Sequence, residues 1–168
     1  MGFTLEGKLS IEITGASEIE AKIRSTTIET LQGQIHQMAE QILKELAHAD
    51  WPAGRATNTY VATGELANAV VVEGGGTNLT IRMDGSRMSM VPPVASSNGK
   101  LGNWGVHMGV RSQPYNTEMP ALLNYGGGGL VQHTGTGYFE EAFGIYESEF
   151  IHILADALRG AGFDVTEG

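Results

Sequence analysis

Histidine is the residue type in this chain best suited to binding a metal or moving a proton, and there are five of them. They are His36, His48, His107, His133 and His152. No two stand at metal-ligand spacing, and the zinc-binding pattern H-E-x-x-H does not occur. His36 and His48 fall on the flanks of one predicted helix and His152 on the polar side of another. We therefore expect solvated or helix-capping histidines, with no metal and no cofactor.

Nucleophilic and acid–base chemistry lack their usual patterns as well. A serine hydrolase needs a G-x-S-x-G elbow, and the nearest string, Asp84-Gly85-Ser86-Arg87, is typical of a turn. The carboxylate pairs Glu140/Glu141 and Glu147/Glu149 are one and two residues apart on a predicted helix, where such neighbours point in different directions. They indicate a solvated face, and we expect no enzymatic activity.

Glycine-rich strings raise the question of a phosphate site. Residues 126–129 are four glycines without the Lys-Ser or Lys-Thr that completes a phosphate-binding loop. Gly135-Thr136-Gly137, just before a predicted helix, could offer backbone N–H groups to an anion, but it adjoins the most acidic part of the chain. Structural turns are favoured, and a small hydrolase or ligand-binding domain is the alternative.

Charge and composition exclude several classes of protein. The chain has 10 basic and 19 acidic residues, a net charge of −9, and residues 112–168 hold 8 acids against 1 base, or −7 of that total. Such a surface repels a phosphate backbone, which argues against ordinary nucleic-acid binding. The absence of cysteine excludes a disulfide framework, and no apolar run approaches the roughly 18 residues of a membrane helix. The N-terminus lacks the pattern of a signal peptide, so we expect synthesis in the cytoplasm.

The first third of the chain predicts a strand followed by a long helix. Residues 3–14 alternate between apolar and polar, and Gly7 interrupts them, which suggests a bulge or a shift in pairing. Ser17 with Glu20 matches a capping box, and the helix is expected to end near Ala49. Its predicted apolar stripe is Ile19, Ile23, Thr27, Leu31, Ile35, Met38, Ile42 and Leu46, with a kink or a close helix contact at Gly33.

The middle of the chain predicts short elements around a long loop. Thr63 is the expected N-cap of a helix of about two turns, and residues 69–84 read as a β-hairpin. Residues 85–117 are expected to be an extended loop or arm, with 104–110 as a third strand inside it.

The last third predicts one short and one long helix. Residues 119–125 form a helical turn that the following glycines end, and the final helix begins after Gly137 and stops at Gly160. Its apolar face is Phe139, Phe143, Tyr146, Phe150, Leu154 and Leu158. The 168 residues thus predict a single α+β domain, in which one long N-terminal helix and one C-terminal helix pack a small, mainly antiparallel sheet.

Three segments resemble a known family in the same order. ATGELANAV (62–70) resembles the D-T-G-x-L-x-x-S-I motif of the siphophage tail-completion family named for gene product ten of HK-type lambdoid phages. MPALLNYGGG (119–128) is similar to its Y-A-x-x-V-E-F-G-T strand end, and TGYFEEAF (136–143) to its P-F-L-x-P-A-L segment. The resemblance extends over nearly the whole chain.

The resemblance implies a structural virion protein of the phage head-to-tail junction. Proteins of this family are not enzymes. They assemble as an oligomeric ring, typically six-fold, between the connector and stopper of the neck and the tail tube, and double-stranded DNA passes without sequence-specific binding. The alternatives are a tail terminator or a minor capsid protein.

Two sets of residues are candidates for such a role. Aromatic and methionine side chains are enriched at interface cores, so the expected subunit-interface anchors are Trp104, Tyr115, Met88 and Met90. Trp104 would alternatively fill the core of the monomer. The expected acidic lumen or surface residues are Glu140, Glu141, Glu147 and Glu149, whose orientation toward a channel is a hypothesis.

Overall fold

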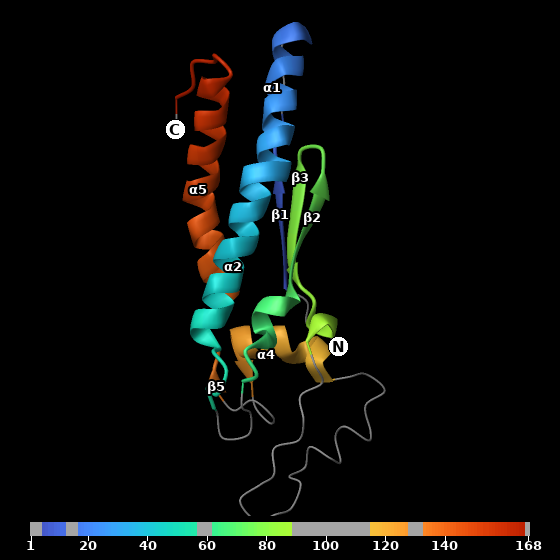
Figure 1. Ribbon diagram of the computed structural model, residues 1–168, viewed down its shortest axis with the longest axis vertical. Coiled ribbons are helices and arrows are strands. Elements are labelled where there is room, and N and C mark those ends of the chain that lie inside the picture. Colours follow the sequence, from blue (N-terminus) through green and yellow to red (C-terminus); the bar gives the residue numbers. More distant parts are fainter. Residues whose placement is uncertain (1–4, 13–16, 57–61, 89–114, 128–132, 167–168) are drawn as a thin grey trace, which may run out of the picture. The chain divides into compact units, whose positions relative to one another are not determined.

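The computed structural model describes residues 5–12, 17–56, 62–88, 115–127 and 133–166. The chain falls into two compact units, each assembled from three separate stretches. Unit 1 comprises Met1–Leu5, Leu43–Val70 and Met83–Phe139, and unit 2 comprises Glu6–Ile42, Val71–Arg82 and Glu140–Gly168. The fold is α+β, as predicted, with an antiparallel sheet and long helices (Figure 1). The single domain expected from the length stays a prediction.

The main sheet of the described residues has three strands in the order β1-β3-β2. These are β1 (Glu6–Ser10), β2 (Val70–Gly75) and β3 (Asn78–Met83). β2 and β3 form the predicted hairpin, and β1 pairs antiparallel with β3. Because side chains alternate between the two faces of a strand, Leu79 and Ile81 share one face and are fully buried, while Arg82 lies on the other.

Gly7 does not form the expected bulge. The register from Glu6↔Arg82 to Ser10↔Asn78 is unbroken, with Gly7 opposite Ile81. A β-carbon at Gly7 would instead overlap the ring of Phe143. The glycine interrupts the apolar alternation because an aromatic ring packs directly against the backbone at this point.

The predicted N-terminal helix forms as a continuous helical run in three parts. They are α1 (Ser17–Thr30), the π-helical turn η1 (Leu31–Ile35) and α2 (His36–Asp50). The N–H of His36 donates to the carbonyl of Leu31, five residues earlier, which is the π pattern. Nothing lies within 4 Å of where a β-carbon of Gly33 would be, so the expected close contact is wrong and the glycine sits in the π turn.

The buried stripe of this helical run differs from the prediction at both ends. Ile19 is 60% exposed and Ile23 is only half-buried, and the pattern changes again after Ile35. Buried positions recur at steps of four residues: Thr27, Leu31, Ile35, Ala39, Leu43 and Ala47. Met38, Ile42 and Leu46 are only half-buried. A step of four exceeds the 3.6 residues of an α-helical turn and would rotate the stripe around a straight helix. The wider π turn takes in an extra residue and offsets part of that rotation.

The final helix, α5 (Tyr138–Gly160), begins and ends where the sequence predicts. In unit 2 it runs beside α1 and the start of α2 (Figure 1). Lys22, near the start of α1, reaches Ala161 beyond the end of α5, whereas Tyr146, nearer the start of α5, reaches Ala39. The helices are therefore antiparallel. The core of unit 2 contains Leu31, Ile35, Ala39, Leu79, Ile81, Ala142, Tyr146 and Phe150.

Unit 1 contains the short elements. They are η2 (Glu65–Ala69), η3 (Gly85–Arg87), η4 (Tyr115–Glu118), α4 (Met119–Tyr125) and the pair β4 (Gly126–Gly127) and β5 (His133–Thr134). Its core contains Leu43, Ala47, Trp51, Leu66, Ala69, Met83, Met119, Leu123, Tyr138 and Phe139. α4 confirms the helical turn predicted for 119–125.

One expectation in unit 1 needs correction. The N-cap of η2 is Gly64, at φ +83°, because the turn there needs a left-handed residue. The Thr63 hydroxyl accepts a long bond, 3.4 Å, from the N–H of Glu65 and donates to the carboxylate of the same residue. Of segment 85–117, only the two ends are described, and they lie in the turns η3 and η4; the extended arm between them stays a prediction. The strand predicted at 104–110 lies outside the described residues.

Candidate functional site

α5 carries the predicted acidic set, and unit 1 fixes where this helix begins. Gly137 is the residue before the helix and has no side chain to cap it. Asn124 of α4 does so instead: its Oδ1, buried with the rest of the side chain, accepts a 2.9 Å hydrogen bond from the N–H of Phe139. The hydroxyl of Tyr138 donates to the carbonyl of Pro120 at 2.9 Å. Two buried polar contacts therefore hold the first turn of α5 to α4.

Two further hydrogen bonds to α4 argue against an anion site in the Gly135-Thr136-Gly137 loop. The N–H of Thr136 donates to the carbonyl of Leu123 at 3.3 Å, and that of Gly137 to the carbonyl of Asn124 at 3.0 Å. A β-carbon at Gly135 would overlap the backbone of Asn124 and Tyr125. The loop is glycine-rich because it packs against α4, and these two amides are already bonded within the protein.

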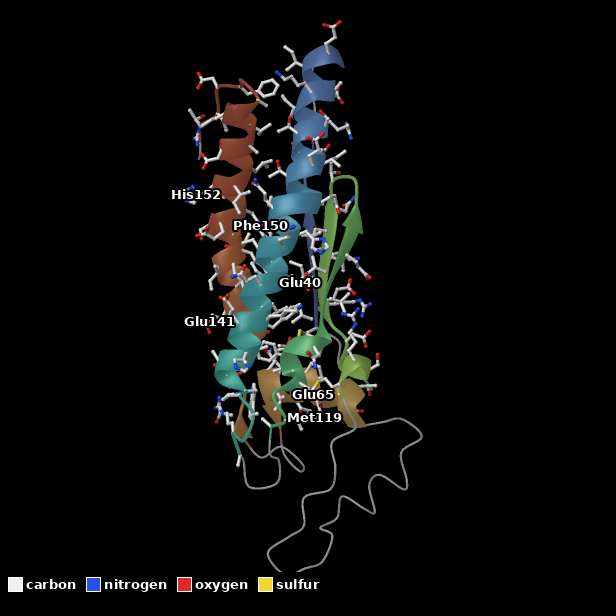
Figure 2. The ribbon with its side chains drawn as sticks, in the orientation of Figure 1. Glu40, Glu65, Met119, Glu141, Phe150 and His152 are labelled. Atoms are coloured by element: carbon white, nitrogen blue, oxygen red, sulfur yellow. The ribbon has the colours of Figure 1, made fainter. Side chains whose placement is uncertain are left out.

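All four glutamates of the acidic set are exposed on α5. Glu140 and Glu141 lie in its first turn, where negative charge suits the helix dipole. At about 100° per residue, the four positions cover an arc of about 200° on the side away from Tyr146. Figure 2 shows Glu141 and His152 extending outward from α5, with Phe150 turned toward α2. The set is a broad outer face, which we call the acidic face, and not a narrow stripe.

An aromatic row anchors α5 in unit 2 beneath this face. The rings of Tyr146 and Phe150 stack with centroids 5.3 Å apart, and Phe143 meets Tyr146 edge-on at 5.1 Å. The Tyr146 hydroxyl donates a 2.7 Å hydrogen bond to the carbonyl of Ala39. Burial raises the pKa of the Tyr146 hydroxyl above its ordinary value, because the phenolate would lose its hydration.

The far end of α5 is closed by a Schellman motif. The N–H of Phe163 donates to the carbonyl of Leu158, and that of Gly162, at φ +92°, to the carbonyl of Arg159. Lys22 of α1 donates to the carbonyl of Ala161 at 2.7 Å, and its ammonium lies 5.3 Å from the centroid of the Phe163 ring. A cation at the C-terminus of a helix complements its dipole. Both ends of α5 are thus capped by residues distant in sequence.

The predicted interface anchors are not brought together in the described structure. Trp104 and Met90 lie outside the described residues, and Tyr115 begins η4 with only its backbone described. Met88 follows η3 and is only 4% exposed, which leaves little of its side chain for a partner to contact. The anchor role of the other three stays a prediction.

The histidines in the described ranges lie on α2, β5 and α5. His36 Nε2 lies 4.0 Å from Glu40 Oε2 on α2, and His48 and His152 are exposed. His133 lies in β5 and His107 outside the described residues. Within the described ranges, no three His, Asp or Glu side chains gather as metal ligands.

Sequence reasoning missed the residues that cap α5. Asn124 follows an apolar run and resembles an ordinary helix-ending residue, and Lys22 resembles a solvated lysine. A partial signal existed for Asn124, because a helix start preceded by glycine has no side-chain acceptor of its own for its first N–H groups.

Comparisons of the chain with protein-family models, with curated proteins and with solved structures find no match. Among the helices in the described ranges, none combines the length and the apolar character that crossing a membrane requires.

Proposed function

We propose that this protein is a structural component of the bacteriophage head-to-tail junction. In this role it is one subunit of a ring, six-fold by the resemblance, that joins the connector and stopper of the neck to the tail tube. It acts through its surfaces, with no cofactor and no catalysis. Its partners are copies of itself, the neck proteins and the tail tube or terminator, and its place is the virion.

The order of the three family-like segments carries this proposal. ATGELANAV leads through η2 into the first residue of β2, MPALLNYGGG spans α4 and runs into β4, and TGYFEEAF opens α5. The resemblance implies a small antiparallel sheet with two packing helices, and the α+β fold has these parts. Each segment is short, so their common order is the stronger argument.

The acidic face of α5 suits the wall of a DNA channel. A DNA channel must let phosphates slide, and a wall of carboxylates offers no cations for phosphates to bind. α5 exposes four glutamates and carries one basic residue, Arg159, in its last turn, where it is paired with Asp156 at 3.0 Å. We assign the acidic face to the inner wall of the ring.

Disruption of the gene in its parent phage tests the placement. We expect DNA-filled heads and separate, complete tails in electron micrographs, with joined particles restored when the protein is supplied in trans. Tails of uncontrolled length would instead favour the tail-terminator alternative, and defective heads a minor capsid protein. Normal virions from the disrupted phage would contradict the proposal.

The wall assignment has a separate test with a matched control. Amide replacement of Glu140, Glu141, Glu147 and Glu149 removes four charges from the acidic face. The control removes four charges from other exposed positions: Glu12, Glu18, Glu29 and Asp164. Virions with the first variant should eject DNA more slowly than wild type, because passing phosphates are repelled less, and the control should eject normally. Equal rates for both variants would place the acidic face away from the channel.

A further inference from the structure

Both outer strands of the main sheet leave one side unpaired among the described residues. β1 and β2 flank β3, as Figure 1 shows, and the three-stranded sheet ends at each of them. An edge strand presents a row of backbone N–H and C=O groups that can pair with another strand. β1 has five residues and β2 has six, so the lengths of the two edges differ by only one residue.

Charges alternate in sign across the polar face of this sheet. On β1, Lys8 Nζ lies 3.4 Å from Glu6 Oε1. Glu6 is paired with Arg82 on β3, and Arg82 Nε lies 3.1 Å from Glu73 Oε1 on β2. The Lys8 side chain is 72% exposed and that of Glu73 is 57% exposed. One edge therefore presents an exposed lysine and the other an exposed glutamate, each ion-paired on one side with a neighbour in its own sheet.

The strand directions favour pairing of unlike edges. β1 and β2 are both antiparallel to β3 and hence parallel to each other. A rotation about an axis along the strands preserves this direction, so it sets β1 of the next copy parallel to β2. Pairing of like edges would be antiparallel, and full overlap of two β1 strands would set Lys8 opposite Lys8. Like charges directly opposite are destabilising, whereas Glu73 beside Lys8 is favourable.

We propose that copies of this chain join edge to edge, with the outer edge of β2 in one copy pairing in parallel with the outer edge of β1 in the next. Lys8 lies beside Glu73 in this junction, and the sheet continues from subunit to subunit. Such a contact uses two different surfaces of each copy, so it generates a closed ring when the rotation closes. The inference rests on the proposed ring and specifies its subunit contact.

Engineered cysteines test this junction cleanly because the chain has none of its own. With Lys8 beside Glu73 on parallel strands, Ser10 lies beside Gly75. Both positions are exposed, and nothing lies within 4 Å of where a β-carbon at Gly75 would be. Within one chain β3 separates the two positions by about 9.5 Å, beyond the roughly 7 Å between α-carbons that a disulfide can bridge. Any Ser10–Gly75 disulfide therefore joins two copies.

The full-length Ser10→Cys/Gly75→Cys variant is oxidised at high protein concentration and separated on a non-reducing gel. We expect a ladder of multimers that ends at the closed ring. The control Ser10→Cys/Glu149→Cys has the same number of exposed thiols, but only one of them lies at an edge of the sheet. It should give no multimer larger than a dimer. An equal ladder in the control, dimers alone from the edge pair, or monomer alone would overturn the proposal.

Charge exchange at the junction provides a second test on the same cysteine background. Glu73→Lys should reduce the multimer yield at least fivefold, because the introduced ammonium would face that of Lys8, and Lys8→Glu should do the same by placing two carboxylates together. Combining the two substitutions should restore the yield. Failure of the combination to recover any yield would refute the assigned register, even if a ladder forms in the parent variant.

These results are separable from the placement of the protein in the phage. If the edge cysteines give a ladder but disruption of the gene leaves normal virions, the results support the edge contact and contradict the neck role. Disrupted phage with unjoined heads and tails, but no ladder from the edge cysteines, would support the neck role and refute this contact.

Discussion

Gly7→Ala is the substitution for which the packing makes the sharpest prediction. Gly7 lies inside β1 opposite Ile81, and an added β-carbon would lie 2.8 Å from Cε2 of Phe143 and closer still to two other ring atoms. In a strand without such a neighbour, alanine is favoured over glycine by roughly 0.5–1 kcal/mol, because glycine loses more conformational freedom on folding. Here the ring must move to make room, so we expect the opposite sign.

The size of the effect follows from two opposing contributions. Forcing an extra carbon into a packed core costs about 1–3 kcal/mol, and the gain from replacing glycine offsets roughly 0.5–1 kcal/mol of it. The expected net loss in the free energy of unfolding is about 1–2 kcal/mol. For a chain of this size, 1 kcal/mol corresponds to about 2–4 °C, so Tm should fall by about 2–8 °C.

Denaturant and thermal unfolding followed by circular dichroism measure this loss, and α5 provides a matched control. Gly144 is exposed, and nothing lies within 4 Å of where its β-carbon would be. Gly144→Ala should therefore stabilise the protein by up to about 1 kcal/mol, the intrinsic helix preference. In a Phe143→Leu background, the cost of Gly7→Ala should shrink, because the ring that it meets is gone.

Two results would refute this reasoning. One is a Gly7→Ala protein as stable as the wild type, which would mean that the ring finds another position without cost. The other is an equal cost of Gly7→Ala with Phe143 and with leucine at that site, which would place the strain elsewhere.

Three further substitutions test the contacts around α5. Tyr146→Phe should lower stability by about 0.5–1.5 kcal/mol through loss of a buried hydrogen bond. Burial raises the pKa of Tyr146, so its contribution to the free energy of unfolding is complete below the pKa of an unfolded tyrosine, near 10, and falls above it. The stability of the wild type should therefore decline more steeply above about pH 10 than that of Tyr146→Phe, as measured by urea unfolding across pH. Asn124→Ala should cost about 1–2 kcal/mol by uncapping the N–H of Phe139, measured by the same unfolding. Lys22→Met should expose the last turn of α5 to faster hydrogen exchange while leaving the first turn unchanged.

The regular elements were predictable because their signals are local. The hairpin at 69–84 combines alternating apolar residues with a glycine cluster, and α5 combines an apolar face of about five turns with terminal charges. Both are confirmed within a residue or two. Patterns of this kind depend on side chains that are neighbours along one element, so a single sequence contains them.

The missed details arise from contacts between distant segments. The buried stripe of α2 runs through Ala39, Leu43 and Ala47. At Ala39 the side chain is small, and the Tyr146 hydroxyl reaches the helix carbonyl. Counting large apolar residues selects Met38 instead. Gly7 is similar, since its reason is a ring 136 positions further along the chain, and no local pattern distinguishes that from a bulge.

The candidate site divides in the same way. Exposure of the acidic face followed from charge density and helix position, and the structure confirms that the four glutamates are exposed on α5. The interface anchors depended on composition alone, and burial of Met88 weakens the part of that prediction which falls in the described residues. The caps of α5, Asn124 and Lys22, need the tertiary fold before they can be recognised.

The strength of the proposed edge contact bears on where the ring forms. A junction between β1 and β2 contains about five paired residues, and each interstrand hydrogen bond contributes only about 0.5–1.5 kcal/mol net. Association of two free copies costs an estimated 4–15 kcal/mol in lost translational and rotational freedom. One junction therefore barely offsets that cost, and free copies should separate readily in dilute solution. A neck that already holds several copies side by side has met most of the cost, so each added junction becomes favourable and the last subunit gains two at once. Edge strands of this length and mixed charge suit a protein that should form a ring on the particle and stay dispersed elsewhere.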